Sequence, residues 1–235
     1  MKKTKQFSFK SKEMKLEHVL FCFVLIGVFS PAHSFGQASL PLDDVIQNVQ
    51  DTYEKTQDLK ADFVQETFMK AARKKLVEKG KVFFKKPRNI LWDYFSPETK
   101  KVVLNSQKAW LYLPREKIAY TQNSSKILQS QVLMSFFSGA GNLKKDFIIR
   151  FARPEATDAE GHFLLVLTPR QKNAGFNEVS VTVDKNDFSI LRIGFDDAVG
   201  NTTTLYFSHQ VVNSRLPQKI FQFQPPAGVE VLPMN

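Results

Sequence analysis

The segment formed by residues 80–120 constrains the fold more than any other part of the chain. Runs of aromatic and branched residues alternate there with the turn sequences Lys-Lys-Pro, Ser-Pro, Asn-Ser-Gln and Pro-Arg-Glu. Short β-forming runs separated by such residues predict consecutive antiparallel strands. These strands would carry more aromatic and aliphatic side chains than a thin sheet needs. We therefore interpret the segment as the wall of a container.

The flanking sequence adds helices and further strands. Apolar residues at helical spacing predict a helix at residues 42–53, whose apolar face should pack on the sheet. The period changes to two at Leu59, which opens the β-rich region. Helical spacing returns at residues 128–137, before Gly139-Ala140-Gly141, and predicts a second helix. The remaining predicted strands are residues 147–151, 163–167, 179–184, 189–195, 203–212 and 220–223.

These elements predict one mainly β domain that also contains helices. A sheet of roughly eleven strands tends to curl into a sandwich or barrel, and helices can cover its open side. A hydrophobic content of 43% with 24% charged residues is typical of globular proteins. Residues 35–235 contain no recognisable linker or repeat, so we expect a single domain there.

The N-terminus has the pattern of a secretory signal peptide. Six lysines within residues 2–15 precede an apolar run at residues 19–29, and small residues follow up to Ser34. The run is shorter than the ~20 residues of a spanning helix, so we expect export with cleavage after Ser34 or after Ala38, rather than anchoring in the membrane. Met14 is an alternative start of translation. A nucleic-acid or nuclear-targeting patch is the rival explanation of the lysines, but it does not account for the apolar run.

Cysteine usage and charge add further limits. Cys22 is the only cysteine, and it lies inside the apolar run after Phe21, a context that does not favour lipid attachment. The mature chain would then have no disulfide and would depend on burial for stability. Removal of residues 1–34 takes away six Lys and two Glu and lowers the net charge from +10 to +6. This surplus permits attraction to anionic headgroups or an acidic partner, whereas no nucleic-acid motif is recognisable.

The sequence gives little support for catalysis or for a metal or organic cofactor. After residue 34 the only histidines are His162 and His209, which we assign to a turn and a strand. No metal-binding, hydrolase or phosphate-binding motif accompanies them. An esterase with an unrecognised site would need an activated serine that the sequence does not indicate.

A set of hydrophobic residues is the main candidate site. For each residue taken alone, a place in an ordinary packed core is the simpler interpretation. Twenty-two Phe in the chain, with a half-closed sheet under a lid, favour an apolar ligand cavity for the set. The predicted wall residues are Phe63, Val82, Phe84, Ile90, Trp92, Leu104, Trp110 and Tyr112, and the predicted lid residues are Val132, Leu133, Phe136 and Phe137.

The order of these motifs resembles that of the LolA family of periplasmic outer-membrane lipoprotein carriers. Gly80 opens the pattern G-x-V-x-x-K-K-P-x-x-x-x-W, which a Pro turn, a Val-containing strand and Trp-Leu-Tyr-Leu-Pro follow. The segments LKADFVQ at residues 59–65, FLLVLTP at 163–169 and QPPAGVEV at 224–231 are also similar to family segments. The resemblance covers roughly residues 40–232 in order.

The resemblance implies an incomplete, strongly curved antiparallel barrel whose helical lid covers an apolar cavity. It also implies a monomeric periplasmic chaperone that takes acylated lipoproteins from an inner-membrane ABC-type release complex and passes them to an outer-membrane lipoprotein receptor, without a cofactor. In the family, an Arg before the Pro of the KRP segment holds the lid shut. Lys86 occupies that position here, so the latch is weaker, relocated to Arg88, or absent.

A second hypothesis belongs to a different functional class. A periplasmic sensor on the same fold could bind lipid or misplaced lipoprotein and signal to a membrane protein. Sensors of this kind usually carry an additional C-terminal domain, whereas this sequence stops at Asn235, soon after the QPPAGVEV segment. We therefore expect a carrier rather than a sensor.

Overall fold

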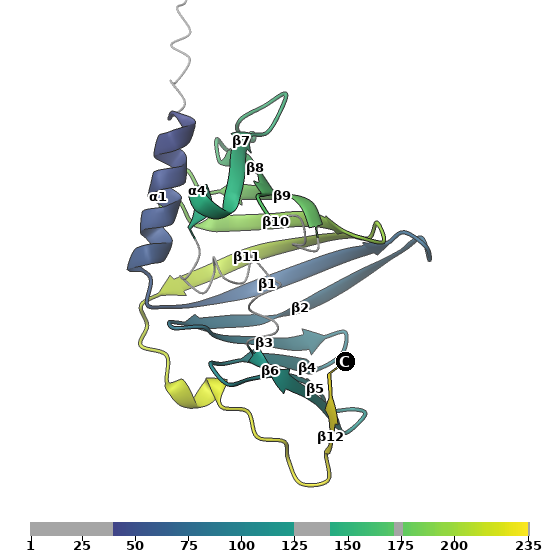
Figure 1. Ribbon diagram of the computed structural model, residues 1–235. Helices are drawn as coiled ribbons and strands as arrows, with labels where there is room; N and C mark the ends of the chain where they lie inside the picture. Colours follow the sequence, from purple (N-terminus) through teal and green to yellow (C-terminus); the bar gives the residue numbers. More distant parts are fainter. Residues whose placement is uncertain (1–39, 125–141, 172–175, 235) are drawn as a thin grey trace, which may run out of the picture. The chain divides into compact units, whose positions relative to one another are not determined.

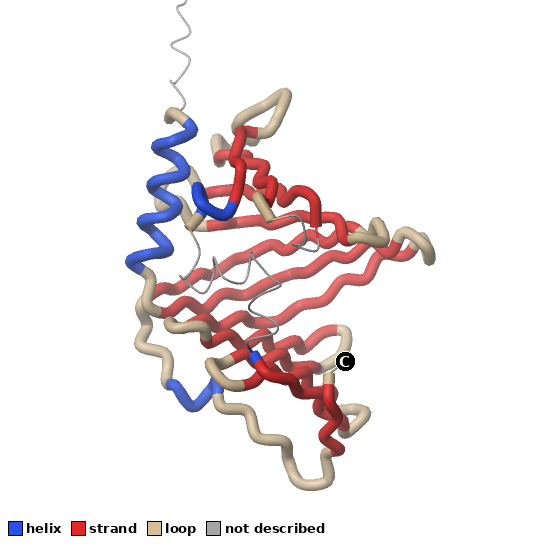
Figure 2. The backbone as a smooth tube through the Cα atoms, viewed as in Figure 1, coloured by secondary structure: helices blue, strands red, loops and turns tan. Residues whose placement is uncertain are grey.

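Twelve strands form one continuous sheet, with β12 at one edge and β7 at the other (Figures 1 and 2). The computed structural model describes residues 40–124, 142–171 and 176–234, all within one compact unit, Ser39–Asn235. The strand order is β12-β6-β5-β4-β3-β2-β1-β11-β10-β9-β8-β7. Every pair is antiparallel except β12 with β6, which is parallel.

The first six strands form one meander, β1 (Asp58–Met69), β2 (Lys74–Lys85), β3 (Asn89–Ser96), β4 (Lys100–Leu104), β5 (Lys108–Leu113) and β6 (Ile118–Asn123). The next five form a second meander, β7 (Phe147–Phe151), β8 (Phe163–Pro169), β9 (Phe176–Val183), β10 (Ile190–Asp197) and β11 (Thr202–Val212). The other elements of the described residues are α1 (Leu42–Lys55), the short helix α4 (Leu143–Asp146), the 3-10 helix η1 (Gln218–Phe221) and β12 (Glu230–Pro233). The two meanders join where β1 pairs with β11.

The structure confirms the predicted fold class. The fold is mainly β, and its antiparallel sheet is not closed into a barrel. The residues that the structure describes form twelve strands rather than about eleven. The predicted second helix, at residues 128–137, lies outside the described residues.

Helix α1 covers one half of the sheet, on what we call the inner face. Asp43 and Asp44 in its first turn favour the helix by interacting with the helix dipole. Val45, Ile46 and Val49 are at most 5% exposed and pack against β8, β9 and β10, as predicted from their spacing. Burial of each such side chain contributes roughly 1.5–3 kcal/mol.

The opposite, outer face of the first meander is covered by the segment that follows β11. Leu216 and Phe221 are buried there against Leu91, Val103 and Trp110. The predicted strand at residues 220–223 is therefore wrong. Those residues include the end of the 3-10 helix η1, and Phe221 points into this cluster instead of joining a ladder.

A buried carboxylate fixes the start of that segment. Asp58 is 3% exposed and accepts hydrogen bonds from the backbone N–H of Ser214 (2.7 Å) and of Leu216 (3.2 Å). The Ser214 hydroxyl donates a third bond to it, at 3.0 Å. Charge-assisted bonds of this kind are among the stronger ones, and here they hold the chain against the beginning of β1.

Gly80 allows the inner face of β1, β2 and β3 to close tightly. A Cβ atom at this position would lie 2.4 Å from the backbone oxygen of Asp93 and 2.6 Å from two ring atoms of Phe63. The Asp93 oxygen belongs to the paired strand β3, so it cannot move aside without disturbing the ladder. Gly80 thus lets Phe63 lie flat over β2.

We predict that Gly80→Ala destabilises the protein by about 1–3 kcal/mol, because the added methyl group overpacks this contact. Urea unfolding followed by circular dichroism measures the change through the shift in midpoint. Lys79→Ala, at the exposed neighbouring position, should change the stability by no more than about 0.5 kcal/mol. Equal midpoints for Gly80→Ala and the parent would contradict the tight contact.

Candidate functional site

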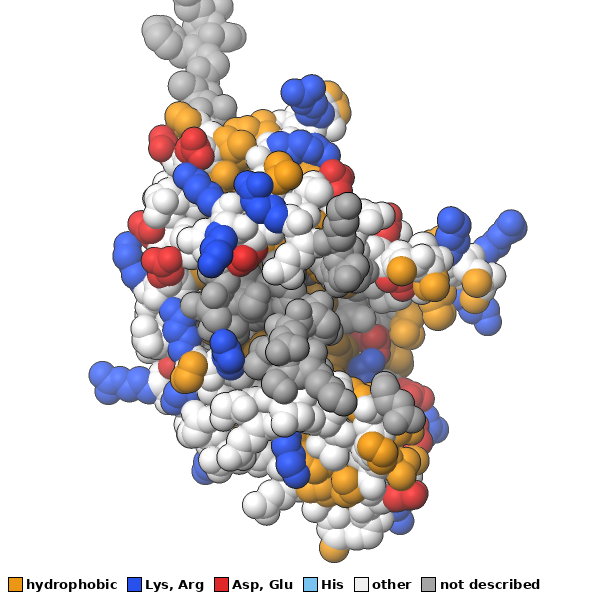
Figure 3. Space-filling model, in the orientation of Figure 1, with side chains coloured by type: hydrophobic (Ala, Val, Ile, Leu, Met, Phe, Trp, Pro, Cys, Tyr) orange, Lys and Arg blue, Asp and Glu red, His pale blue; other side chains and the backbone are white. Residues whose placement is uncertain are grey.

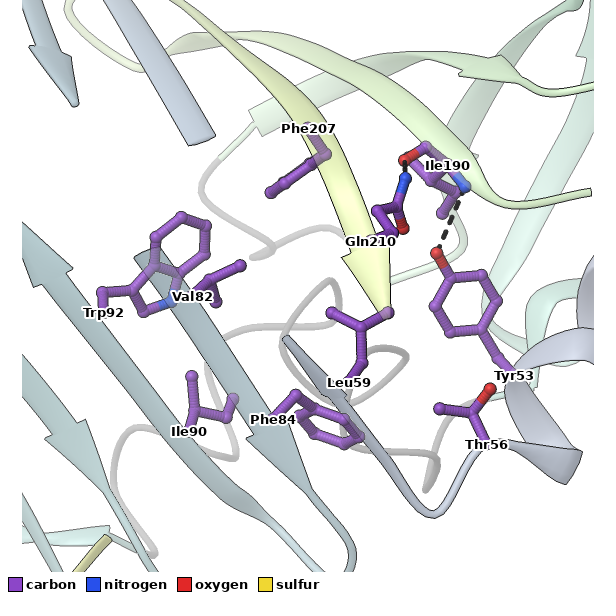
Figure 4. A pocket seen from close by; sticks show the side chains of 10 residues that line it. All are labelled: Tyr53, Thr56, Leu59, Val82, Phe84, Ile90, Trp92, Ile190, Phe207 and Gln210. Carbon is purple, nitrogen blue, oxygen red and sulfur yellow. Dashed lines mark hydrogen bonds between the residues drawn. The ribbon is translucent and has the colours of Figure 1, made fainter. Parts of the chain in front are cut away.

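An apolar cavity lies where the C-terminal end of α1 meets the inner face of the sheet (Figure 4). Its walls come from α1 and from β1, β2, β3, β10 and β11, so both meanders contribute. The cavity volume is about 40 Å³. The lining residues are Tyr53, Thr56, Leu59, Val82, Phe84, Ile90, Trp92, Ile190, Phe207 and Gln210.

Three polar side chains of this wall, those of Tyr53, Thr56 and Gln210, are engaged in hydrogen bonds. The Ile190 N–H donates to the Tyr53 hydroxyl oxygen at 3.3 Å, and Gln210 Nε2 donates to the Ile190 carbonyl at 2.9 Å (Figure 4). The Thr56 hydroxyl donates to the carbonyl of Thr52 at 2.8 Å. Burial raises the pKa of Tyr53 above its ordinary value, which keeps the phenol neutral. The cavity can therefore hold an apolar group by excluding it from water, but it presents no charge.

Aromatic contacts set the shape of one side of the cavity. The Trp92 ring meets the edge of Phe63, with ring centres 4.7 Å apart and an interplanar angle of 74°. Phe207 from β11 lies 6.2 Å from Trp92. Phe63 is only 2% exposed, so the Trp92 ring packs on a buried side chain. Trp92 itself is half-buried and faces the cavity (Figure 4).

Beyond Trp92 the same face of the sheet becomes polar. Glu78, 8% exposed, forms an ion pair with Lys100 at 2.6 Å and accepts a hydrogen bond from Gln65 Nε2 at 3.2 Å. The Tyr94 hydroxyl donates to Gln65 Oε1 at 3.1 Å, and burial together with the nearby Glu78 raises the pKa of Tyr94. The inner face thus has an apolar end beside α1 and a hydrogen-bonded polar end toward the β1–β2 turn.

The predicted wall residues divide into three groups. Val82, Phe84, Ile90 and Trp92 line the cavity. Phe63 and Leu104 lie on the same face but are buried behind the lining, with Phe63 against Trp92 and Leu104 against Phe84 and Ile90.

Trp110 and Tyr112 do not line this cavity, which corrects their grouping with the wall residues. Side chains two apart on a strand share a face, and Ala109 is the residue of β5 that pairs with Leu104 on the inner face. Trp110 and Tyr112 consequently point to the outer face, where both contact Phe223. The predicted lid residues Val132, Leu133, Phe136 and Phe137 lie outside the described residues.

Several lining residues are missing from the sequence-based set. Leu59 and Phe207 belong to alternating strand patterns, and Tyr53 belongs to the apolar face of α1, so each looks like an ordinary core residue. Only the pairing of β1 with β11 brings them together. No local spacing pattern indicates that long-range contact.

Lys86 holds the end of α1 at the cavity. Its ammonium group donates to the carbonyl oxygens of Tyr53 (3.0 Å) and Glu54 (2.7 Å) in the last turn of the helix. The last carbonyls of a helix generally lack donors from within the helix, and a cation favours the negative end of the helix dipole. Arg88, the other candidate latch residue, is exposed in the β2–β3 turn, with φ of 59°.

Among the described residues, no group of three or more His, Cys, Asp or Glu side chains has the arrangement of a metal site. The described residues also contain no helix that is long and hydrophobic enough to cross a membrane.

We predict that Lys86→Met loosens the last turn of α1, because two helix carbonyls lose a charged donor. The expected loss of stability is about 1–2 kcal/mol, and hydrogen exchange should speed up in the last turn of the helix first. Lys60→Met, at an exposed lysine of β1, is the matched control. Equal exchange of the last turn in the two variants would show that Lys86 does not hold the helix.

Comparison with known proteins supports the resemblance seen in the sequence. The family model for "Outer membrane lipoprotein carrier protein LolA" matches residues 54–224. The outer-membrane lipoprotein carrier protein of Dechloromonas aromatica is 27% identical over 211 residues, which cover 90% of this chain and 93% of that protein. The protein of the same name from Methylococcus capsulatus is also 27% identical, over 74% of this chain and 80% of its own length.

A solved structure supports the fold alone. An uncharacterized conserved protein from Thermus thermophilus superposes with a TM-score of 0.52 at 15% identity, covering 82% of this chain and 98% of its own. The family match spans most of the chain and includes nearly all strands of the sheet. The chain therefore belongs to the LolA family of outer-membrane lipoprotein carrier proteins.

Proposed function

We propose that this protein binds the acyl chains of lipoproteins in the cavity beside α1 and carries them from the inner to the outer membrane. The observation that carries the proposal is the cavity wall, in which apolar side chains predominate and the side chains of Tyr53, Thr56 and Gln210 are already hydrogen-bonded. Membership of the LolA family, and relatives named outer-membrane lipoprotein carrier proteins, support it.

The size of the cavity bears on how a ligand would be held and released. An acyl chain of roughly sixteen carbons gains on the order of 12 kcal/mol by leaving water, at about 0.8 kcal/mol per CH₂. A cavity of about 40 Å³ has room for only a few water molecules. Loading therefore requires the walls to separate, and the cost of this opening offsets part of the gain. A carrier benefits from that offset, because its cargo must also leave.

The change of polarity along the inner face suggests how a lipoprotein lies. Its acyl chains would occupy the apolar end, against Phe84 and Ile90 near α1. Its polar glycerol and peptide portion would extend past Trp92 toward the ion pair of Glu78 and Lys100. This orientation leaves the hydrogen-bonded polar groups in contact with a polar part of the cargo.

The same proposal covers location and partners. Residues 1–34 act as a cleaved signal peptide that delivers the chain to the periplasm, where it works as a monomer. The donor is an inner-membrane ABC-type lipoprotein release complex, and the acceptor is an outer-membrane lipoprotein receptor. The protein works as a carrier and not as an enzyme, so it needs no cofactor.

Two half-buried aromatic residues on opposite faces of the sheet allow a matched test. We predict that Trp92→Glu lowers the affinity for a fluorescent acyl probe at least tenfold, about 1.4 kcal/mol, since it places a carboxylate in the apolar wall. Tyr112→Glu, on the outer face against Phe223, should bind the probe as the parent does. Both variants should keep a cooperative thermal transition. Unchanged binding by Trp92→Glu would show that the probe binds elsewhere on the protein.

Native mass spectrometry of protein purified from its own periplasm tests the cargo and the processing together. We expect a chain that begins at Phe35 and carries an acylated lipoprotein as an adduct. An adduct of free phospholipid alone would favour the lipid-sensing alternative over the carrier. Retention of residues 1–34 would disprove the predicted cleavage.

A further inference from the structure

The β1–β2 hairpin extends past its neighbour β3. The pairing of β2 with β3 ends at Lys79, so residues 74–78 of β2 pair with β1 alone. At about 3.3 Å per residue, this leaves roughly 15 Å of β2 that does not pair with β3, while β1 remains paired with β11 as far as Phe68. We call residues 66–77 the hairpin tip. Figures 1 and 2 show β1 and β2 extending past β3, beside the β10–β11 turn.

The hairpin tip combines exposed cations with exposed apolar side chains. Lys70, Arg73, Lys74 and Lys75 are all exposed, and Glu66, paired with Lys75 at 2.8 Å, is the only acidic residue of the tip. Phe68 is 46% exposed, Leu76 36% and Val77 37%. In the space-filling view, basic and hydrophobic side chains gather at this projection (Figure 3).

The adjacent β10–β11 turn extends the apolar part of this surface. The Lys70 N–H donates to the Asn201 side chain at 3.1 Å, which joins the turn to the hairpin. Val199 in that turn is 76% exposed. The turn also carries Asp196 and Asp197, whose carboxylates accept hydrogen bonds from Thr202 and from the backbone of Val199 and Asn201. With Glu66, these give three carboxylates beside the four cations of the tip, so the positive charge is concentrated at the end of the hairpin.

Apolar residues are exposed on both faces of the hairpin tip. Leu76 and Val77 are consecutive in β2, so their side chains point to opposite faces, and each is more than a third exposed. A flat protein surface could cover only one of these faces. The headgroup region of a membrane surrounds an inserted hairpin and can contact both, while anionic headgroups attract the lysines.

From these observations we propose that the hairpin tip is a membrane-contact element that binds anionic phospholipid surfaces reversibly. Phe68, Leu76 and Val77 enter the headgroup region, and Arg73 and Lys74 pair with lipid phosphates. The contact is separate from the acyl cavity, because the tip and the α1 end lie at opposite ends of the long strands β1 and β2 (Figure 1). It would keep the carrier at a bilayer surface while cargo moves in or out.

Vesicle flotation with two pairs of matched variants tests this contact. The vesicles contain phosphatidylglycerol with phosphatidylcholine, or phosphatidylcholine alone. Arg73→Gln with Lys74→Gln should weaken binding to the anionic vesicles roughly 25-fold, about fivefold for each charge. Lys60→Gln with Lys219→Gln removes the same charge from exposed positions away from the tip and should have little effect.

Phe68→Ser with Val77→Ser should also weaken binding several-fold, whereas Ile148→Ser with Val212→Ser, at equally or more exposed positions, should not. All four variants should bind the acyl probe like the parent, so a failure here leaves the carrier proposal standing. The membrane contact is disproved if the parent does not float with anionic vesicles, or if the controls lose as much binding as the tip variants. Capture of an acidic protein through Arg73 and Lys74 without vesicle binding would disprove it as well.

Discussion

The pairing of β1 with β11 is the contact on which the rest of the structure depends. Leu59 lies opposite Val212, and Phe63 opposite Phe207, so residues about 150 positions apart in the chain become neighbours. This ladder turns two local meanders into one sheet. It also places Ile190, Phe207 and Gln210 from the second meander against Val82, Phe84 and Ile90 from the first. Without it, α1 would cover a sheet of five strands and there would be no cavity.

Helix α1 is also placed to leave a site beside it. Its apolar face packs against β8, β9 and β10. Only its C-terminal end, with Tyr53 and Thr56, reaches the first meander. The half of the inner face that α1 does not cover is the half that carries Phe84, Ile90 and Trp92. Lys86 connects these two parts, since it leaves the end of β2 and binds the last helical carbonyls. The stability of the helix end and the shape of the cavity are therefore linked.

Local pattern predicted most of the fold, because strand alternation and turn residues are short-range signals. Helix α1, the strands of both meanders and the mainly β class were predicted in this way, whereas the incomplete barrel was implied by the family resemblance. Two features could not be predicted. The hairpin tip lacks alternation, because its lysines interrupt the apolar residues. Residues 220–223 have the composition of a strand, although Phe221 packs in a cluster on the outer face. For the site, the periodicity of β2 and β3 correctly predicted that Val82, Phe84, Ile90 and Trp92 line the cavity. Trp110 and Tyr112 show that apolar character alone does not reveal which face of the sheet a strand residue occupies.

The unclosed sheet has a mechanical consequence. In a closed barrel, the number of strands and their stagger fix the circumference, so the interior cannot widen unless ladder hydrogen bonds break. Within the described part of the chain, β7 and β12 each pair with a strand on one side only, so the sheet can change its curvature while every ladder from β12 to β7 stays paired. Flattening moves the inner-face side chains apart at the cost of side-chain packing only. The interior is thus elastic, because it can widen while the backbone hydrogen bonds of the sheet are kept.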